Sequence, residues 1–238
     1  RASGESGEIL DARSISETIG AKGSGKKLDL ASIRPLTPVA PGKIVAVGRN
    51  YADHARELGN EPPPEPIIFL KPPSSLLPPG GTIEIPPASQ RVDFEGELAV
   101  VIGRKARNVS EESWRDFVFG FTCANDVTAR DLQKRDVQFT RGKSFDTFLP
   151  LGPCIETDLD PSSLRLQTRL NGEGRQDGNT SAMIFSVGSI VAFISGVMTL
   201  EEGDVILTGT PSGVGPMRSG DRVEIDIEGI GVLRNEVR

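Results

Sequence analysis

The stretch Asp93-Phe94-Glu95-Gly96-Glu97 opens the apolar run LAVVIG at residues 98–103 and is the strongest local signal in the sequence. Residues 97–103 have the composition of a buried strand. Side chains two positions apart in a strand point to the same face, so we expect Glu95 and Glu97 to converge. Two like charges held at the edge of an apolar strand repel each other unless a cation neutralises them.

Working outward from this strand, apolar and alternating runs predict more strands than helices. Strands are expected at residues 43–48, 67–71, 82–85, 119–125, 164–170, 204–208, 222–226 and 232–237. Helices are expected at residues 53–58, 110–117 and 183–200, and Asn171-Gly172 is a strong hairpin signal. Because the strands do not alternate regularly with helices, the sequence predicts a β-rich α+β protein.

The composition is that of a soluble globular protein and argues against two classes of partner. The formal net charge is −6 and no run of Lys or Arg stands out, so we expect no nucleic-acid partner and no anionic membrane surface. Residues 183–200 carry no charge and approach the length of a membrane span. Their serines and glycines, and the polar turn that follows, favour a buried helix packed on a sheet.

The N-terminal part of the chain is weakly patterned. Residues 1–40 are rich in Ser, Gly and Lys, and predict a small N-terminal segment and linker before a catalytic domain at residues 41–238. The two cysteines, Cys123 and Cys154, form no CxxC pair and are expected to be small buried thiols. Such cysteine usage is compatible with a cytoplasmic location.

A third carboxylate, Asp126, follows the apolar segment FTCAN and is a natural companion of Glu95 and Glu97. The chain contains a single histidine, which excludes a histidine-rich zinc site. An all-oxygen site favours a hard cation, Mg²⁺ or Mn²⁺, with Ca²⁺ as a third choice. The alternative is that the two glutamates are ordinary solvated charges on a strand face.

That single histidine, His54, lies in the short helix expected at residues 53–58, with Glu57 three positions later on the same face. A carboxylate can orient the imidazole ring and raise its basicity, which makes a general base; the alternative is an exposed helix residue. The proline-rich stretch EPPPEP follows the helix. A short helix between a strand and a proline segment is a candidate mobile lid, at residues 50–66.

Polar residues after Asp126 and a glycine loop near the C-terminus are candidates for substrate binding. Arg130, Gln133 and Lys143 lie in a charged stretch and suit a substrate carboxylate or a developing enolate, although spacing alone does not separate them from neighbouring basic residues. The loop at residues 208–216 lacks a dinucleotide or P-loop motif. It can still present backbone N–H groups and the Thr210 hydroxyl to an anion, or be a plain turn.

Six stretches together resemble the fumarylacetoacetate hydrolase family. They are GRNYADHARE, DFEGELAVVIG, GFTCANDVTARDLQ, GKSFDTFLPLGP, NGEGRQDGNTSAMIFS and GDVILTGTPSGVG, and they cover most of residues 41–238 in the family order. The resemblance is greatest to the small acylpyruvate hydrolase and oxaloacetate decarboxylase members and to the 2-hydroxyhepta-2,4-diene-1,7-dioate isomerases. It implies a β-rich roll of several sheet layers and a homodimer.

The resemblance also implies roles for the candidate residues. Glu95, Glu97 and Asp126 match the metal-binding carboxylates, and His54 and Glu57 match a catalytic lid dyad. The remaining matches line the 2-oxo acid pocket: Arg130, Gln133, Lys143 (which stabilises an enolate) and Thr210.

Three reactions of a 2-oxo acid pass through the same kind of enolate. Our first hypothesis is metal-dependent hydrolysis of a C–C bond in a 3-acylpyruvate, such as acetylpyruvate or fumarylpyruvate, with water activated by His54 and Glu57. The alternatives are isomerisation of a dienedioate or decarboxylation of an oxaloacetate-type acid in aromatic catabolism. A non-catalytic metal-binding homologue is a third hypothesis, and the retention of every polar site position argues against it.

Overall fold

The chain folds into short strands with a few short helices. In this computed structural model, residues 6–10, 17, 23–29 and 35–238 are described. A mixed seven-stranded sheet contains, in spatial order, β4 (Ile67–Lys71), β3 (Ile44–Gly48), β14 (Val205–Leu207), β8 (Gly96–Ile102), β9 (Val118–Asn125), β11 (Leu149–Glu156) and β5 (Leu76–Leu77). A five-stranded sheet contains β13 (Glu173–Asn179), β12 (Arg165–Leu170), β16 (Arg222–Ile227), β17 (Gly231–Val237) and β6 (Thr82–Ile83).

The remaining elements are short. A three-stranded sheet contains β10 (Thr128–Ala129), β7 (Val92–Phe94) and β15 (Gly215–Met217). From residue 35 onward the α-helices are α2 (Ala52–Glu57), α3 (Arg130–Arg135), α4 (Thr140–Lys143) and α5 (Val187–Val197), and the 3₁₀ helices are η2 (Pro73–Ser75), η3 (Trp114–Phe117), η4 (Pro161–Ser163) and η5 (Thr180–Ala182). The β-rich α+β architecture expected from the sequence is confirmed.

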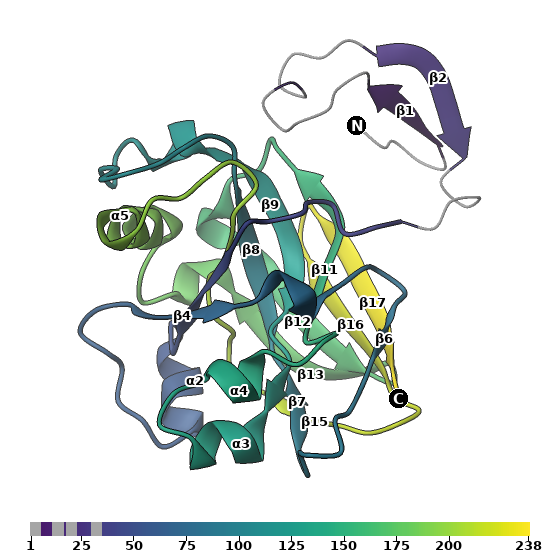
Figure 1. The fold of residues 1–238 in the computed structure, drawn as a ribbon, viewed down its shortest axis with the longest axis vertical. Coiled ribbons are helices and arrows are strands. Elements are labelled where there is room, and N and C mark those ends of the chain that lie inside the picture. The colour runs from purple at the N-terminus through teal and green to yellow at the C-terminus, as the bar shows by residue number, and fades with distance from the viewer. Residues whose placement is uncertain (1–5, 11–16, 18–22, 30–34) are drawn as a thin grey trace.

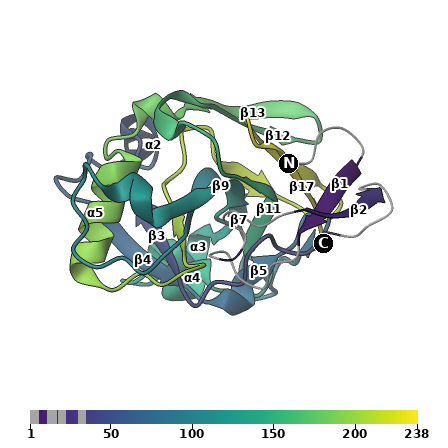
Figure 2. The same cartoon turned by 90° about the horizontal axis from the view of Figure 1, so that it is seen from above.

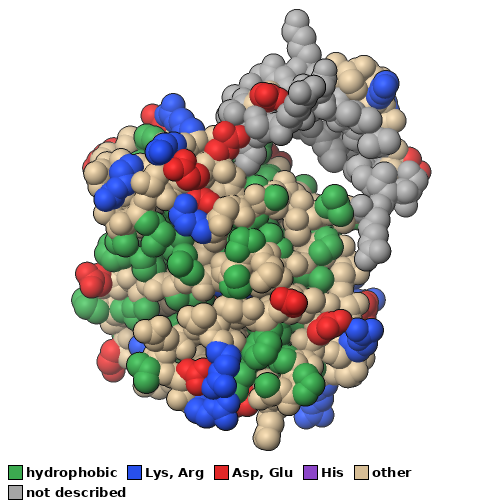
Figure 3. All heavy atoms as spheres, viewed as in Figure 1, with side chains coloured by type: hydrophobic (Ala, Val, Ile, Leu, Met, Phe, Trp, Pro, Cys, Tyr) green, Lys and Arg blue, Asp and Glu red, His purple; other side chains and the backbone are tan. Residues whose placement is uncertain are grey.

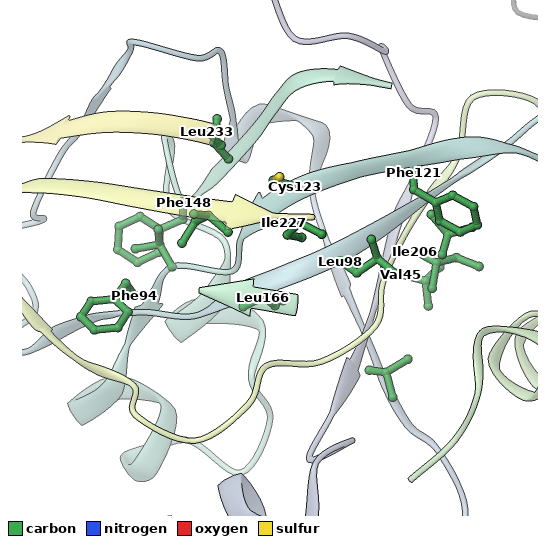
Figure 4. Packing of buried hydrophobic residues seen from close by; sticks show 14 of the residues in the cluster. Val45, Phe94, Leu98, Phe121, Cys123, Phe148, Leu166, Ile206, Ile227 and Leu233 are labelled. Atoms are coloured by element: carbon green, nitrogen blue, oxygen red, sulfur yellow. The ribbon is translucent and has the colours of Figure 1, made fainter. Parts of the chain in front are cut away.

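Strand β8 is buried on both faces, which explains its uninterrupted apolar sequence. Leu98, Val100 and Ile102 belong to a core cluster that includes residues of the five-stranded sheet. Figure 4 shows this cluster, with Leu98 of β8 near Leu166 of β12 and Ile227 of β16. Ala99 and Val101 belong to a second cluster on the opposite face, as the two-residue period of a strand requires. Glu97 is two residues before Ala99, so its side chain lies on the same face of β8 as this second cluster.

The functional residues gather at one end of the seven-stranded sheet. Figure 1 shows α3 and α4 at the bottom of the view beside β7 and β15, with α2 next to them and α5 higher on the left. Figure 2 shows from above that α5 and the β12–β13 pair lie on different sides. The packed sheets thus provide a fixed platform, and short helices surround one end of it.

Two expected helices differ from the observed ones. Residues 110–117 form a turn and then the 3₁₀ helix η3, with bonds from Ser113 N to Ser110 O and from Asp116 N to Ser113 O. The Ser110 hydroxyl lies 3.1 Å from Ser113 Oγ rather than capping an α-helix. The expected helix at residues 183–200 is shortened to α5, because the Ser186 side chain caps it by accepting from Ser189 N.

The N-terminal segment is described only in part. Strands β1 (Ser6–Leu10) and β2 (Gly23–Asp29) pair antiparallel with each other. Residues 1–5, 11–16, 18–22 and 30–34 lie outside the described residues, so the division of the chain near residue 40 stays a prediction.

The two cysteines differ in exposure. Cys123 is buried, as expected, but Cys154 is exposed, which corrects the expectation for that residue. The reason is local, because β11 loses its register with β9 between Gly152 and Glu156, where Cys154 lies. Among the described residues, no helix combines the length and the apolar character that a membrane crossing needs. On the face shown in Figure 3, acidic and basic side chains are interspersed.

Candidate metal centre

Three carboxylates meet where β8 begins and β9 ends. Glu97 lies in β8, Glu95 just before it, and Asp126 just after β9, to which β8 pairs antiparallel. Asp126 N donates to Glu95 O at 2.8 Å, so the pairing continues past the ends of both strands. One oxygen from each of the three side chains lies within 4.8 Å of the others, and all three residues are buried. The structure therefore brings together the three carboxylates expected from the sequence.

The glycine between the two glutamates is required by close packing. A Cβ at Gly96 would lie 2.4 Å from Thr168 Oγ1 of β12, far inside any contact distance. Gly96 N donates to Gln176 Oε1 at 3.0 Å, which fixes this backbone against β13. The five-stranded sheet thus determines where Glu95 and Glu97 point.

Three buried cations surround these carboxylates. Lys143 Nζ lies 2.8 Å from Glu95 Oε2 and 2.6 Å from Asp126 Oδ2. Arg130 pairs with Glu95 and, at 2.9 Å, with Asp93. On the other side of Asp126, Lys71 Nζ lies 2.6 Å from Oδ1 and also donates to the Lys143 carbonyl at 2.6 Å. Lys71 thereby connects the third carboxylate to the backbone that carries Lys143.

The two glutamates have opposite electrostatic environments. Burial alone would raise the pKa of Glu95, but Lys143 and Arg130 hold that pKa well below its usual range. The pKa of Glu97 is raised by burial and then by the negative charges of Asp126 and Glu95. No described ammonium or guanidinium lies within ion-pair distance of Glu97; its carboxylate accepts from Gly209 N at 2.7 Å. A buried carboxylate without a cationic partner, next to two others, is a donor set that fits a divalent cation.

Tyr51, the residue before α2, also supports a cation beside Glu97. Its hydroxyl is buried and has no hydrogen-bond partner among the described residues. Burial and then the charge of Glu97 raise the pKa of the Tyr51 phenol. A buried hydroxyl usually has a partner, so a polar group beside Glu97 would satisfy it.

His54 and Glu57, in the candidate lid at residues 50–66, form a pair. His54 Nδ1 lies 3.2 Å from Glu57 Oε2, one turn later in α2, and His54 is only 4% exposed. The alternative of an exposed helix histidine is therefore wrong. Glu57 also accepts from Gly213 N at 3.0 Å, so it joins the lid to the glycine loop. Gly213 has φ +97°, and a Cβ there would lie 2.2 Å from Arg175 O, so this donor position requires glycine.

The glycine loop is neither a plain turn nor a free anion site. Its N–H groups at Gly209 and Gly213 donate to Glu97 and Glu57, which are side chains of the protein itself. The Thr210 hydroxyl donates to Gly96 O at 2.8 Å and accepts from Gln176 Nε2 at 2.7 Å. Thr210 thus holds the loop to Gly96 and Gln176 by hydrogen bonds, and it also lines the site.

These residues share one cavity of about 300 Å³. Eight of the nine candidate residues line it: His54, Glu95, Glu97, Asp126, Arg130, Gln133, Lys143 and Thr210. Glu57 reaches the cavity through its contact with His54. Gln133 accepts from Arg130 Nη1 at 2.7 Å, which orients the guanidinium.

Sequence reasoning missed several residues of the site. Lys71 is 1% exposed and pairs with Asp126. Asp93 is fully buried and pairs with Arg130. Lys71 ends an apolar strand, and Asp93 stands two residues before Glu95. Both signals are visible in the sequence, yet many surface residues share them. Tyr51 and Gln176 were also missed, because their roles depend on contacts between distant segments.

Comparison with known proteins agrees with this geometry. Residues 43–238 match the family model described as fumarylacetoacetate (FAA) hydrolase C-terminal. The chain belongs to the fumarylacetoacetate hydrolase family. It is 48% identical over 201 residues to a mitochondrial oxaloacetate tautomerase of Arabidopsis thaliana, covering 82% of this chain and 90% of that protein.

Two solved structures of family members are also similar. The 2-hydroxyhepta-2,4-diene-1,7-dioate isomerase from Mycobacterium marinum has a TM-score of 0.90 and 46% identity, covering 98% of this chain and 87% of that one. The fumarylpyruvate hydrolase from Pseudomonas aeruginosa, solved in complex with Mn²⁺ and pyruvate, has a TM-score of 0.80 and 31% identity, covering 87% of this chain and 98% of that one. The family resemblance expected from the sequence is confirmed.

Proposed function

We propose that this protein is a divalent-cation-dependent enzyme that moves a proton at the carbon next to the oxo group of a small 2-oxo acid. The observation that carries the proposal is the shared cavity: a buried His54–Glu57 pair, an ammonium and three carboxylates all meet there. Relatives with 46% and 48% identity are named isomerase and tautomerase, which favours proton transfer over bond cleavage.

Glu95, Glu97 and Asp126 would hold the cation, with Mg²⁺ or Mn²⁺ the best fit to an all-carboxylate donor set. A cation bound there acts as a Lewis acid toward the oxo group. Its identity is part of this proposal, supported by the Mn²⁺ complex of the hydrolase relative.

Side chains of the protein supply the base, the stabilisation of negative charge and the binding of the substrate carboxylate. Glu57 accepts a hydrogen bond from His54 Nδ1–H, which leaves Nε2 free to take the proton from the substrate carbon. The Lys143 ammonium, fixed by Glu95 and Asp126, stabilises negative charge that develops on the substrate oxygens. Arg130 is held by Asp93, Gln133 and Glu95, and presents the N–H groups that these three leave free to the substrate carboxylate.

Hydrolysis of a 3-acylpyruvate is the second candidate. The same His54–Glu57 pair could activate a water for attack on the distal carbonyl, and the fumarylpyruvate hydrolase relative supports this use. Decarboxylation of an oxaloacetate-type acid needs neither a base nor an activated water. The homodimer and the cytoplasmic location remain proposals beside these.

The deciding experiment follows three products in parallel with Mg²⁺ present. Ketonisation of enol-oxaloacetate is measured by ultraviolet absorbance, pyruvate release from acetylpyruvate and fumarylpyruvate by a coupled assay, and CO₂ release from oxaloacetate directly. We expect ketonisation to be fastest, and His54→Ala to lower it by about 10²-fold or more, the usual scale for loss of a general base.

The control is Asp53→Asn on the same helix, where Arg56 is the one ion-pair partner of Asp53 among the described residues and the Asp53 side chain is 82% exposed. That variant should keep full activity. Pyruvate release that exceeds ketonisation would make hydrolase the correct name. If His54→Ala reduces no reaction while the fold and metal binding are intact, the proposed role of His54 is wrong.

A further inference from the structure

Tyr51 connects the start of α2 with the metal centre. It is 3% exposed and directly precedes α2, and its carbonyl accepts from Ala55 N at 2.9 Å, the first hydrogen bond of that helix. The hydroxyl at the other end of the residue is buried and has no hydrogen-bond partner among the described residues. Most buried hydroxyls have a partner, so this one indicates a group that Tyr51 contacts in another state of the site.

Glu97 is a group with the complementary need. Burial and then the charge of Glu97 raise the pKa of the Tyr51 phenol, so the hydroxyl lies within the electrostatic reach of that carboxylate. Glu97 is itself buried beside two other carboxylates, and its oxygen accepts from Gly209 N. A phenol that keeps its proton can donate to such a carboxylate without adding a charge to the site.

The residue before Tyr51 is anchored to the same loop that holds Glu97. Asn50 is fully buried, and its side chain donates to Thr208 O at 2.8 Å. A Cβ at Gly209 would lie 2.7 Å from Asn50 Cβ, so the backbone that donates to Glu97 packs directly against Asn50. The position of Tyr51 is therefore set by the body of the protein, while the helix that begins after it has few contacts.

We propose that Tyr51 is a positioning residue for the cation: with a divalent cation bound, its hydroxyl donates to Glu97 and thereby couples metal binding to ordering of the lid at residues 50–66. Metal-binding carboxylates are themselves hydrogen-bonded, and loss of such an outer partner costs about 10- to 100-fold in metal affinity. Because the Tyr51 carbonyl accepts the first bond of α2, fixing its side chain also fixes the start of the lid. The inference rests on the proposed function, because that function places the cation at Glu95, Glu97 and Asp126.

Tyr51→Phe tests the proposal because it removes the hydroxyl and keeps the ring. We expect isothermal titration with Mn²⁺ to give a Kd about tenfold higher than in the wild type. The melting temperature in EDTA should stay the same or rise, because the lost hydroxyl has no partner there among the described residues. An unchanged Kd would overturn the inference.

Thr122→Val is the matched control for removal of a buried hydroxyl. Thr122 Oγ1 is also buried without a partner among the described residues, but Thr122 lies within β9, opposite Ala99 of β8. Its Kd for Mn²⁺ should equal that of the wild type. An equal rise in Kd in both variants would show that Tyr51 has no special relation to the cation, and would overturn the inference.

A spectroscopic readout is available because Tyr51 is the single tyrosine of the chain. Protein labelled with ¹³C at the tyrosine ζ carbon gives one resonance from that label, which needs no further assignment. We expect Mg²⁺ to shift this resonance in the wild type, and the same Mg²⁺ concentration to leave it unshifted in Glu97→Gln. A wild-type resonance that does not respond to saturating Mg²⁺ would contradict the proposed hydrogen bond.

Hydrogen exchange with Mg²⁺ alone tests the coupling to the lid. Exchange in residues 50–66 should slow in the wild type and slow less in Tyr51→Phe, with each protein saturated by Mg²⁺. Equal slowing in the two proteins would mean that other contacts couple the lid to the cation, and would overturn this part of the proposal.

The same titrations separate the inference from the proposed function. If the wild type binds no Mn²⁺, the metal-dependent function fails and the inference fails with it. If the wild type binds Mn²⁺ and is active, but Tyr51→Phe binds Mn²⁺ equally well, only the inference fails. If Mn²⁺ binding depends on Tyr51 while the wild type transfers no proton in any 2-oxo acid, the proposed function fails and the role of Tyr51 stands.

Discussion

The floor of the cavity and its lid are built in different ways. The floor consists of carboxylates at the ends of β7, β8 and β9, and each is tied to buried cations or backbone N–H groups. The lid is the six-residue helix α2 followed by a proline segment. It contacts the body through the Asn50 side chain, which bonds to Thr208 and Phe185, and through Glu57 on Gly213.

This difference matches the work assigned to each part. Charges that hold a cation must keep their spacing, and strands packed on both faces provide that rigidity. A base that must admit substrate and then approach it is better placed on a segment with few contacts. Residues 50–66 are therefore expected to open and close over a fixed floor.

The largest expected effect comes from removing a floor carboxylate. Glu97→Gln should lower activity by more than about 10²-fold, because even residues that only support metal ligands cost 10- to 100-fold. EDTA should inactivate the wild type, and Mg²⁺ or Mn²⁺ should restore it. Isothermal titration with Mn²⁺ measures the loss of metal binding, and the exposed strand residue Glu236 provides the control variant Glu236→Gln.

The same variant has an opposite effect on the metal-free protein. Glu97 is a buried charge whose pKa is raised by burial and by its carboxylate neighbours, so its ionised form destabilises the fold at neutral pH. Glu97→Gln should therefore leave the melting temperature in EDTA unchanged or higher. A large decrease in that temperature would mean that Glu97 stabilises the floor without a cation.

Lys71→Met tests how the floor is held together. Loss of this ammonium leaves Asp126 with one cation fewer in a buried site, and breaking a buried pair costs about 3 kcal/mol of the free energy of unfolding. Urea unfolding in EDTA measures this cost. Lys105→Met, which removes an exposed pair with Glu201, should cost less than about 1 kcal/mol. Equal costs for the two variants would contradict the proposed importance of Lys71.

Two substitutions at Glu57 separate its two contacts. Glu57→Gln keeps an acceptor for Gly213 N–H but removes the charge beside His54, whereas Glu57→Ala removes both. We expect both variants to lower activity about tenfold, the scale of a hydrogen bond to a charged group. Only Glu57→Ala should also speed amide exchange in residues 50–66, and equal exchange in the two variants would mean that Glu57 does not hold the lid.

The smallest effect expected is a change in lid protection on ligand binding. Oxalate with Mg²⁺ should slow hydrogen exchange in residues 50–66 and leave β8 and β9 unchanged. Exchange measured by mass spectrometry with and without oxalate tests this. If the lid exchanges at the same rate in both conditions, the contrast between a fixed floor and a moving lid is not supported.

Much of this protein follows from local sequence. The apolar run after Glu97 determines a doubly buried strand, and Asn171-Gly172 determines a hairpin, in which both residues have positive φ. The two-residue period brings Glu95 and Glu97 to one side, and one helical turn brings His54 to Glu57. Each of these relations spans only a few residues, so periodicity and propensity are sufficient to predict it.

Tertiary structure alone decided the partners of those residues. Lys71 reaches Asp126 across 55 positions, and Gly209 and Gly213 reach Glu97 and Glu57 across more than one hundred. Nothing local distinguishes Lys71 from a surface lysine. Its role depends on which charges burial brings together, because desolvation and pairing energies arise only when distant segments pack against one another.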